Sequence, residues 1–97
     1  GHPIYEGISI NLLYKSDELL ITEIIRKKTS KEPLHENHDH KTLSVLIKGK
    51  LKLTIDDKIF IAERGDLWVH KIGSHHSIEA LEDSAELSIK SPPVKTW

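Results

Sequence analysis

The chain has 97 residues, of which 37% are hydrophobic and 30% are charged. Its 14 basic and 15 acidic residues give a formal charge of -1, and the scattered lysines argue against a nucleic-acid-binding surface. There is no cysteine, no apolar run of membrane-spanning length and no visible signal peptide, so we expect a soluble, cytoplasmic protein without disulfides. The length suits a single domain spanning 1–97, with its core at about 7–93.

Short segments in which branched aliphatic residues alternate with polar residues follow one another from the N-terminus onward. Period-two alternation predicts strands, although 19–28 also allows a short helix. We expect a loop at Thr29–Pro33, because proline cannot donate to a strand ladder, and a hairpin turn at Asp56-Asp57. The predicted strands are 8–12, 19–28, 42–48, 51–55, 59–61, 67–70, 75–81 and 85–91. So many short strands separated by turns predict an all-β sandwich or barrel.

Two of these strands present one apolar and one mixed or polar face. In 42–48 the odd-numbered residues are aliphatic, whereas the even-numbered face carries Thr42 and Ser44. In 85–91 the odd-numbered residues are Ala85, Leu87 and Ile89, and the opposite face carries Glu86, Ser88 and Lys90. A polar strand face is either exposed to solvent or lines a wet cavity. The histidines that continue the first polar face backwards favour the cavity.

Histidine is concentrated in two clusters. Six of the seven histidines lie between residues 35 and 76: His35, His38, His40, His70, His75 and His76. Neutral imidazole is the commonest side-chain metal ligand, so we ask whether the two clusters meet inside a barrel. His76 shares strand parity with Ile78 and Ala80 and is therefore expected to point inward, whereas His75 should point outward.

The two clusters lie in stretches that resemble the motifs of a small single-domain cupin. The first motif is a histidine cluster, a strand and a glycine turn, from His35 to Gly49. The second is a Gly65-Asp66 turn, a short strand, a corner and a histidine, ending at His76. Within the cupins the chain is most similar to the pectin-degradation cupins, which convert unsaturated uronates to linear keto sugars. Pro33-Leu34-His35 and the run from Ala80 to Pro93 carry that similarity.

The resemblance implies a double-stranded β-helix, or jelly-roll, barrel that forms a dimer and holds a divalent metal by three histidines and a glutamine. The ligands expected here are His76 and two of His35, His38 and His40, with zinc, nickel, iron, manganese or cobalt as the metal. The chain departs from the family pattern at three positions. The glutamine ligand falls on Thr42, the proposed catalytic acid on Ser88, and a neighbouring aromatic residue on Lys90. A packing role is expected for His70.

Three functions remain open at this point. The resemblance implies a metal-dependent isomerase or lyase acting on a small sugar acid or a similar polar metabolite. The losses at Thr42 and Ser88 favour a non-catalytic cupin that binds or senses a small ligand, and an iron-dependent dioxygenase is a third alternative. Glu86 is the candidate acid–base group, or a fourth ligand, if it faces the cavity rather than solvent. Lys90 suggests either an ion pair or a site for an anionic substrate.

The apolar strand faces predict a partner. Six apolar side chains would point away from the cavity and lie in water unless a second sheet or subunit covers them. We therefore expect a two-fold symmetric homodimer, with the N-terminal strand near Ile8–Leu12 possible as a cap over the contact. The six residues are Leu43, Val45, Ile47, Ala85, Leu87 and Ile89.

Overall fold

The computed structural model describes residues 6–36, 41–71 and 73–91, and for 33–36 it describes the backbone only. These residues form nine strands and no helix, which confirms the all-β prediction. The segment at 20–26 is a strand rather than a helix. The strands are β1 (Ile8–Lys15), β2 (Leu20–Arg26), β3 (Lys31–Glu36), β4 (Lys41–Lys48), β5 (Lys50–Ile55), β6 (Lys58–Glu63), β7 (Leu67–His70), β8 (His75–Ala80) and β9 (Ser84–Ser91).

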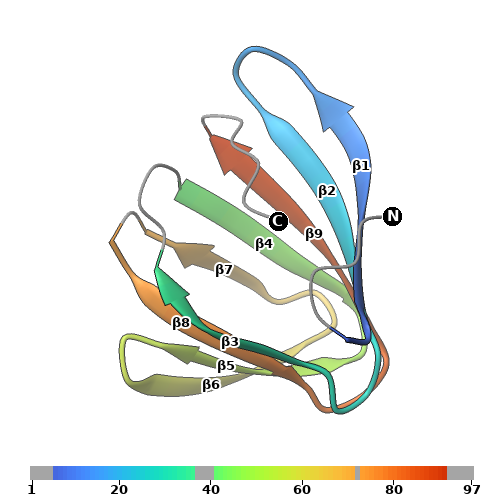
Figure 1. Ribbon diagram of the computed structural model, residues 1–97, viewed down its shortest axis with the longest axis vertical. Coiled ribbons are helices and arrows are strands. Elements are labelled where there is room, and N and C mark those ends of the chain that lie inside the picture. The colour runs from blue at the N-terminus through green and yellow to red at the C-terminus, as the bar shows by residue number, and fades with distance from the viewer. Residues whose placement is uncertain (1–5, 37–40, 72, 92–97) are drawn as a thin grey trace.

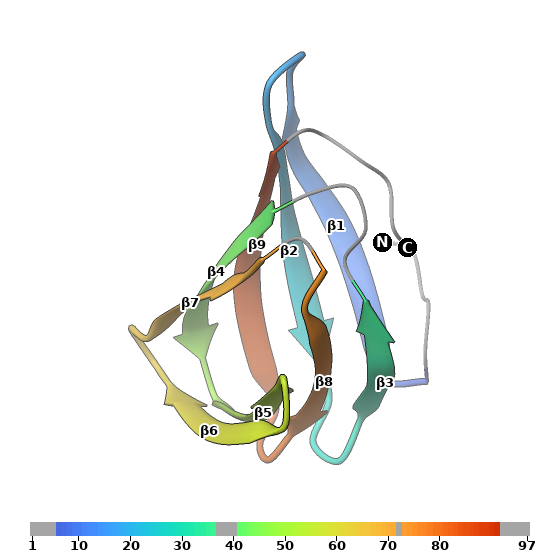
Figure 2. The same cartoon turned by 90° about the vertical axis from the view of Figure 1, so that its left-hand side faces the viewer.

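The strands make two antiparallel sheets that face each other as the walls of a jelly-roll barrel (Figures 1 and 2). The five-stranded sheet has the order β1-β2-β9-β4-β7, and the four-stranded sheet has the order β3-β8-β5-β6. Neighbours in space are thus often distant in sequence, as in the pairing of β2 with β9. The described residues contain no helix long and apolar enough to cross a lipid bilayer.

Tight turns join several neighbouring strands. Asp56 and Asp57 both have positive φ, as a two-residue hairpin between β5 and β6 requires. Gly49 turns the chain between β4 and β5 with a φ of 91°, and a Cβ there would lie 2.5 Å from the carbonyl oxygen of Asp83. Gly49 therefore meets both a conformational and a steric demand for glycine.

The loop expected at Thr29–Pro33 is shorter than predicted, because Lys31 already begins β3. Proline is tolerated in β3 because this strand lies at the edge of its sheet, where one row of backbone groups is not needed for pairing. The register of β3 against β8 shifts between Glu32 and His35, around Pro33. No strand was predicted between 28 and 42, so the proline rule missed β3 altogether.

The buried apolar residues gather in two clusters inside the barrel. The main apolar cluster includes Leu46, Leu51 and Ala80, which lie near the turn that joins β4 to β5. A second cluster, Ile8, Ile10 and Ile24, fills the space beside β1 and β2. The N-terminal strand therefore extends the five-stranded sheet and faces the interior with Ile8 and Ile10, so it does not cap the outer face.

The two sheets differ in the character of their outer faces. On the five-stranded sheet, cross-strand rows of apolar residues point outward, whereas the row through Lys31, Glu79 and Lys52 on the four-stranded sheet is charged. The predicted faces of β4 and β9 are confirmed, because Thr42, Ser44, Leu46, Glu86, Ser88 and Lys90 are all buried. The outward apolar rows are Ile21, Ile89, Leu43 and Val69, and next to them Leu87, Val45 and Leu67.

Candidate functional site

Polar side chains line the interior of the barrel beyond its apolar cluster. Strand alternation puts them there, because every second residue of β2, β4 and β9 points inward. In the register, Thr42 lies between Lys90 and His70. In the next inward-facing row, Ser88 lies beside Ser44. The buried polar set on these walls is Thr22, Arg26, Thr42, Ser44, His70, His76, Glu86, Ser88 and Lys90. A wall this polar suits a hydrophilic occupant better than an apolar one.

Arg26, the last residue of β2, and Glu86 of β9 form a buried ion pair inside the barrel. Arg26 Nε donates to Glu86 Oε1 at 2.6 Å, and both side chains are 2% exposed. Arg26 Nη1 also donates to Glu32 Oε1 at 3.0 Å, which connects the five-stranded sheet to β3 of the other sheet. Burial raises the pKa of Glu86, and Arg26 offsets only part of that rise. Burial lowers the pKa of Arg26, but the two carboxylates raise it by more.

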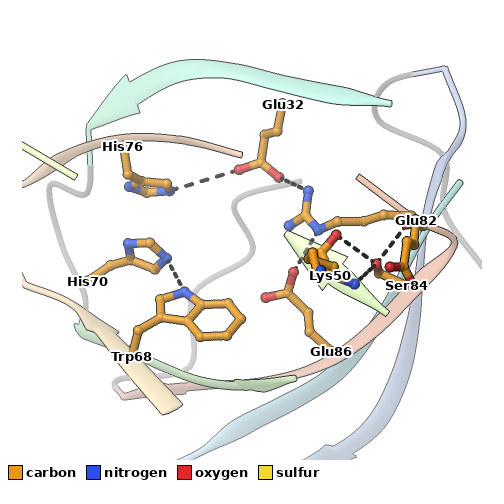
Figure 3. Close-up of polar contacts among 9 residues, drawn as sticks. Glu32, Lys50, Trp68, His70, His76, Glu82, Ser84 and Glu86 are labelled. Carbon is orange, nitrogen blue, oxygen red and sulfur yellow. Dashed lines mark hydrogen bonds and ion pairs between the residues drawn. The ribbon is translucent and has the colours of Figure 1, made fainter. Parts of the chain in front are cut away.

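A second group of contacts begins at the other oxygen of Glu32 (Figure 3). Glu32 Oε2 lies 3.8 Å from His76 Nε2, within ion-pair range but beyond hydrogen-bond length. The His76 ring stacks on His70, with ring centroids 3.9 Å apart and planes inclined by 27°. Trp68 Nε1 donates to His70 Nε2 at 3.0 Å. Glu32, His76, His70 and Trp68 thus connect the two sheets near the ends of β7 and β8.

Lys90 supplies a second cation to the interior. Its side chain points inward from β9 and the residue is 7% exposed. Burial lowers the pKa of Lys90, while the charges of Glu32 and Glu86 raise it in part. Lys90 therefore lies within electrostatic range of the two carboxylates that bind Arg26.

The predicted site residues fall into two groups. Among those described, His76 points inward and is buried and His75 points outward, both as predicted. Glu86, for which cavity and solvent were both open, faces the interior. His35 is the register partner of His76 across β3 and β8, and its side chain is not described. His38 and His40 lie outside the described residues. Within the described ranges, no group of three or more His, Cys, Asp or Glu side chains could hold a metal ion.

His70 is unsuited to coordinate a metal through Nε2, because that lone pair accepts the proton of the Trp68 indole. This agrees with the packing role expected for it. The ring of Trp68 packs against the main apolar cluster, while its nitrogen donates to His70.

Arg26 and Glu32 are the members of this site that the sequence pattern did not single out. Arg26 had a detectable signal, because it shares parity with Leu20, Thr22 and Ile24 on β2, all of which are buried. Glu32 had no detectable signal in the sequence, since it precedes a proline and lies where the register of β3 against β8 is irregular. Its contact with Arg26 depends on the packing of the two sheets.

The architecture matches solved structures over nearly the whole chain. KdgF from Halomonas sp. superposes with a TM-score of 0.92 at 18% identity, covering 97% of this chain and 86% of KdgF. An RmlC-like cupin from Shewanella frigidimarina gives a TM-score of 0.89 at 20% identity, covering 96% and 83%. The chain has the cupin fold. A cupin-fold protein from Thermotoga maritima, described as a predicted oxalate decarboxylase, gives 0.76 at 16% identity, covering 90% and 81%.

Sequence comparison adds nothing to this. No protein-family model and no curated protein matches the chain. At 16–20% identity these three structures establish the cupin fold alone. The function therefore depends on the residues inside this particular barrel.

Proposed function

We propose that this cupin-fold protein binds a small anionic metabolite, of the size and polarity of a sugar acid, beside a divalent metal ion inside its barrel. The observation that carries the proposal is the inward-facing set His76, Lys90 and Thr42, buried where an ordinary barrel core would be aliphatic. Lys90 offers a buried cation on the same wall as Thr42, and an ammonium group is a suitable partner for the carboxylate of a small acid.

The residues present fit a metal in part. His76 offers a buried imidazole, and His35 follows it in the register of the neighbouring strand. The segment that carries His38 and His40 joins β3 to β4, and Thr42 near the start of β4 pairs with His70. Three neutral nitrogens would suit zinc, nickel, iron, manganese or cobalt and disfavour magnesium and calcium. When bound, such an ion polarises a carbonyl or hydroxyl of its ligand.

Charge balance favours an anion as the metabolite. In their ionised forms Arg26 and Lys90 cancel Glu32 and Glu86. A divalent ion held by neutral histidines would leave the interior with excess positive charge, which a carboxylate ligand would neutralise. The similarity to the oxalate decarboxylase candidate from Thermotoga maritima supports a small acid as the ligand class.

Binding without rapid turnover fits the interior better than efficient catalysis. The sequence offered Glu86 or a free histidine as the acid–base group, and the Glu86 carboxylate is engaged by Arg26 at 2.6 Å. Thr42 and Ser88 occupy the positions where the resemblance implied a ligand and a catalytic acid. Isomerisation of an unsaturated uronate remains the second candidate, because KdgF superposes so closely.

The test of the metal site compares two adjacent histidines. We expect His76→Ala to abolish tight binding of nickel or zinc, measured by calorimetry on tag-free protein, because the metal needs several donors at once. His75→Ala is the matched control and should bind nearly as wild type, since His75 points out of the barrel. Equal effects of the two substitutions would contradict the proposal. Metal analysis of the purified protein also distinguishes the proposed function from an iron-dependent dioxygenase, because redox-active iron would favour oxygen chemistry.

Turnover is tested with unsaturated uronate. We expect weak or absent conversion by the metal-loaded protein, followed by loss of the alkene absorbance, because Thr42 and Ser88 replace two active-site groups of the pectin-degradation cupins. Conversion as fast as that of a dedicated enzyme would show that these replacements are no obstacle. If conversion occurs and survives Glu86→Gln, then Glu86 is not the group that moves protons.

A further inference from the structure

We infer that Glu32 is the residue that orients His76 and fixes which of its ring nitrogens carries the proton. The inference rests on the proposed metal site for its consequence, although the proton position itself exists without metal. Glu32 bridges two partners: Oε1 accepts from Arg26 Nη1 at 3.0 Å, and Oε2 faces His76 Nε2 at 3.8 Å. One side chain therefore connects the buried ion pair to the candidate ligand.

The bridge is held firmly at its Arg26 end. Arg26 is 2% exposed, and Glu86 fixes its Nε from the neighbouring strand β9. The planar guanidinium thus directs Nη1 toward Glu32, which is only 15% exposed. With Oε1 committed to Arg26, the carboxylate has little freedom to turn, and Oε2 remains directed at His76 (Figure 3).

A carboxylate oxygen favours a proton on the nitrogen that faces it. The contact of 3.8 Å is electrostatic rather than a formed hydrogen bond, but its sign favours N–H at Nε2 of a neutral ring. The lone pair then lies on Nδ1, the nitrogen that would coordinate a metal. An imidazole held by a carboxylate on one nitrogen and a metal on the other is a recurrent arrangement in metal sites.

His70, whose ring stacks on His76, should carry its proton on the other type of ring nitrogen. His70 Nε2 accepts the indole proton of Trp68 at 3.0 Å, so a neutral His70 must carry its own proton on Nδ1. The two rings lie 3.9 Å apart yet should be opposite tautomers. His70 therefore serves as an internal reference for His76, because its tautomer depends on Trp68 and not on Glu32.

The experiment is long-range proton–nitrogen correlation NMR on metal-free, histidine-labelled protein at a pH where both rings are neutral. We expect the Nε2–H tautomer at His76 and the Nδ1–H tautomer at His70. In Glu32→Gln the amide oxygen should stay on Arg26 and turn the NH2 group toward His76, which should move the His76 proton to Nδ1. Glu79→Gln on the adjacent strand β8 is the matched control and should leave both rings unchanged.

Metal titration gives a second readout. Glu32→Gln should weaken nickel or zinc binding about 10- to 100-fold, whereas Glu79→Gln should not change it. An Nδ1–H tautomer at His76 in the wild-type protein would overturn the inference, and this measurement needs no variant. Unchanged metal affinity in a folded Glu32→Gln protein would also overturn it. If wild-type protein binds no metal while the tautomers are as expected, the proposed metal site fails and the orienting role of Glu32 stands.

Discussion

Arg26→Met should lower the free energy of unfolding by about 3–5 kcal/mol at pH 7, because it leaves Glu86 buried without its counter-charge. The methionine fills most of the space of the arginine stem, so the loss arises mainly from electrostatics rather than from a cavity. Urea denaturation monitored by tryptophan fluorescence measures the effect. For a domain of this size each kcal/mol corresponds to about 4–8 °C in melting temperature.

The pH dependence of that loss has a defined sign. Burial raises the pKa of Glu86, and removing Arg26 would raise it further. When the pKa of a carboxyl is higher in the folded protein than in the unfolded chain, its contribution to stability is fully present at pH values below the pKa of the unfolded chain. That contribution is lost as the pH rises through the pKa of the folded protein. The deficit of Arg26→Met should therefore shrink at pH 5 relative to pH 7. The double variant Arg26→Met/Glu86→Leu removes both charges and should recover much of the stability. A deficit of Arg26→Met that does not change with pH would contradict a charged Glu86.

Val45→Lys should convert a homodimer into a monomer or an insoluble protein. We propose that two copies associate through the outer face of the five-stranded sheet, where Val45 lies between Leu87 and Leu67 in the register. Several exposed side chains extend this apolar surface, including Leu43 at 38%, Ile47 at 48% and Val69 at 41% exposure. A lysine ammonium buried there without a partner would weaken association at least about 100-fold.

Light scattering at micromolar concentration measures the mass directly. Wild-type protein should have twice the chain mass of 11.1 kDa, and Val45→Lys should have the single mass or precipitate. Thr54→Lys on the outer face of β5 is the matched control, because Thr54 belongs to the other sheet and pairs there with Ser77. A well-folded wild-type monomer would contradict the dimer, although the inward orientation of the polar face of β4 and β9 would remain as described.

Strand alternation by itself determined much of this protein. Period two in the aliphatic residues predicted an all-β sandwich or barrel, and the parity of β4, β8 and β9 put Thr42, His76 and Glu86 on the faces that line the interior. The same parity left Leu43, Val45 and Leu87 facing outward. These features are local, since side chains of a strand alternate between its two faces whatever the strand pairs with.

Only the tertiary structure decided how the inward residues meet. Arg26 and Glu86 are 60 positions apart in the chain, and they form a pair because β2 lies beside β9. Glu32 joins them from the opposite sheet, at a proline-disrupted register that no alternation rule describes. The stacking of His70 on His76 likewise depends on β7 and β8 belonging to different sheets. Periodicity specifies the face on which a side chain lies, whereas its partner is set by strand order and the packing of two sheets.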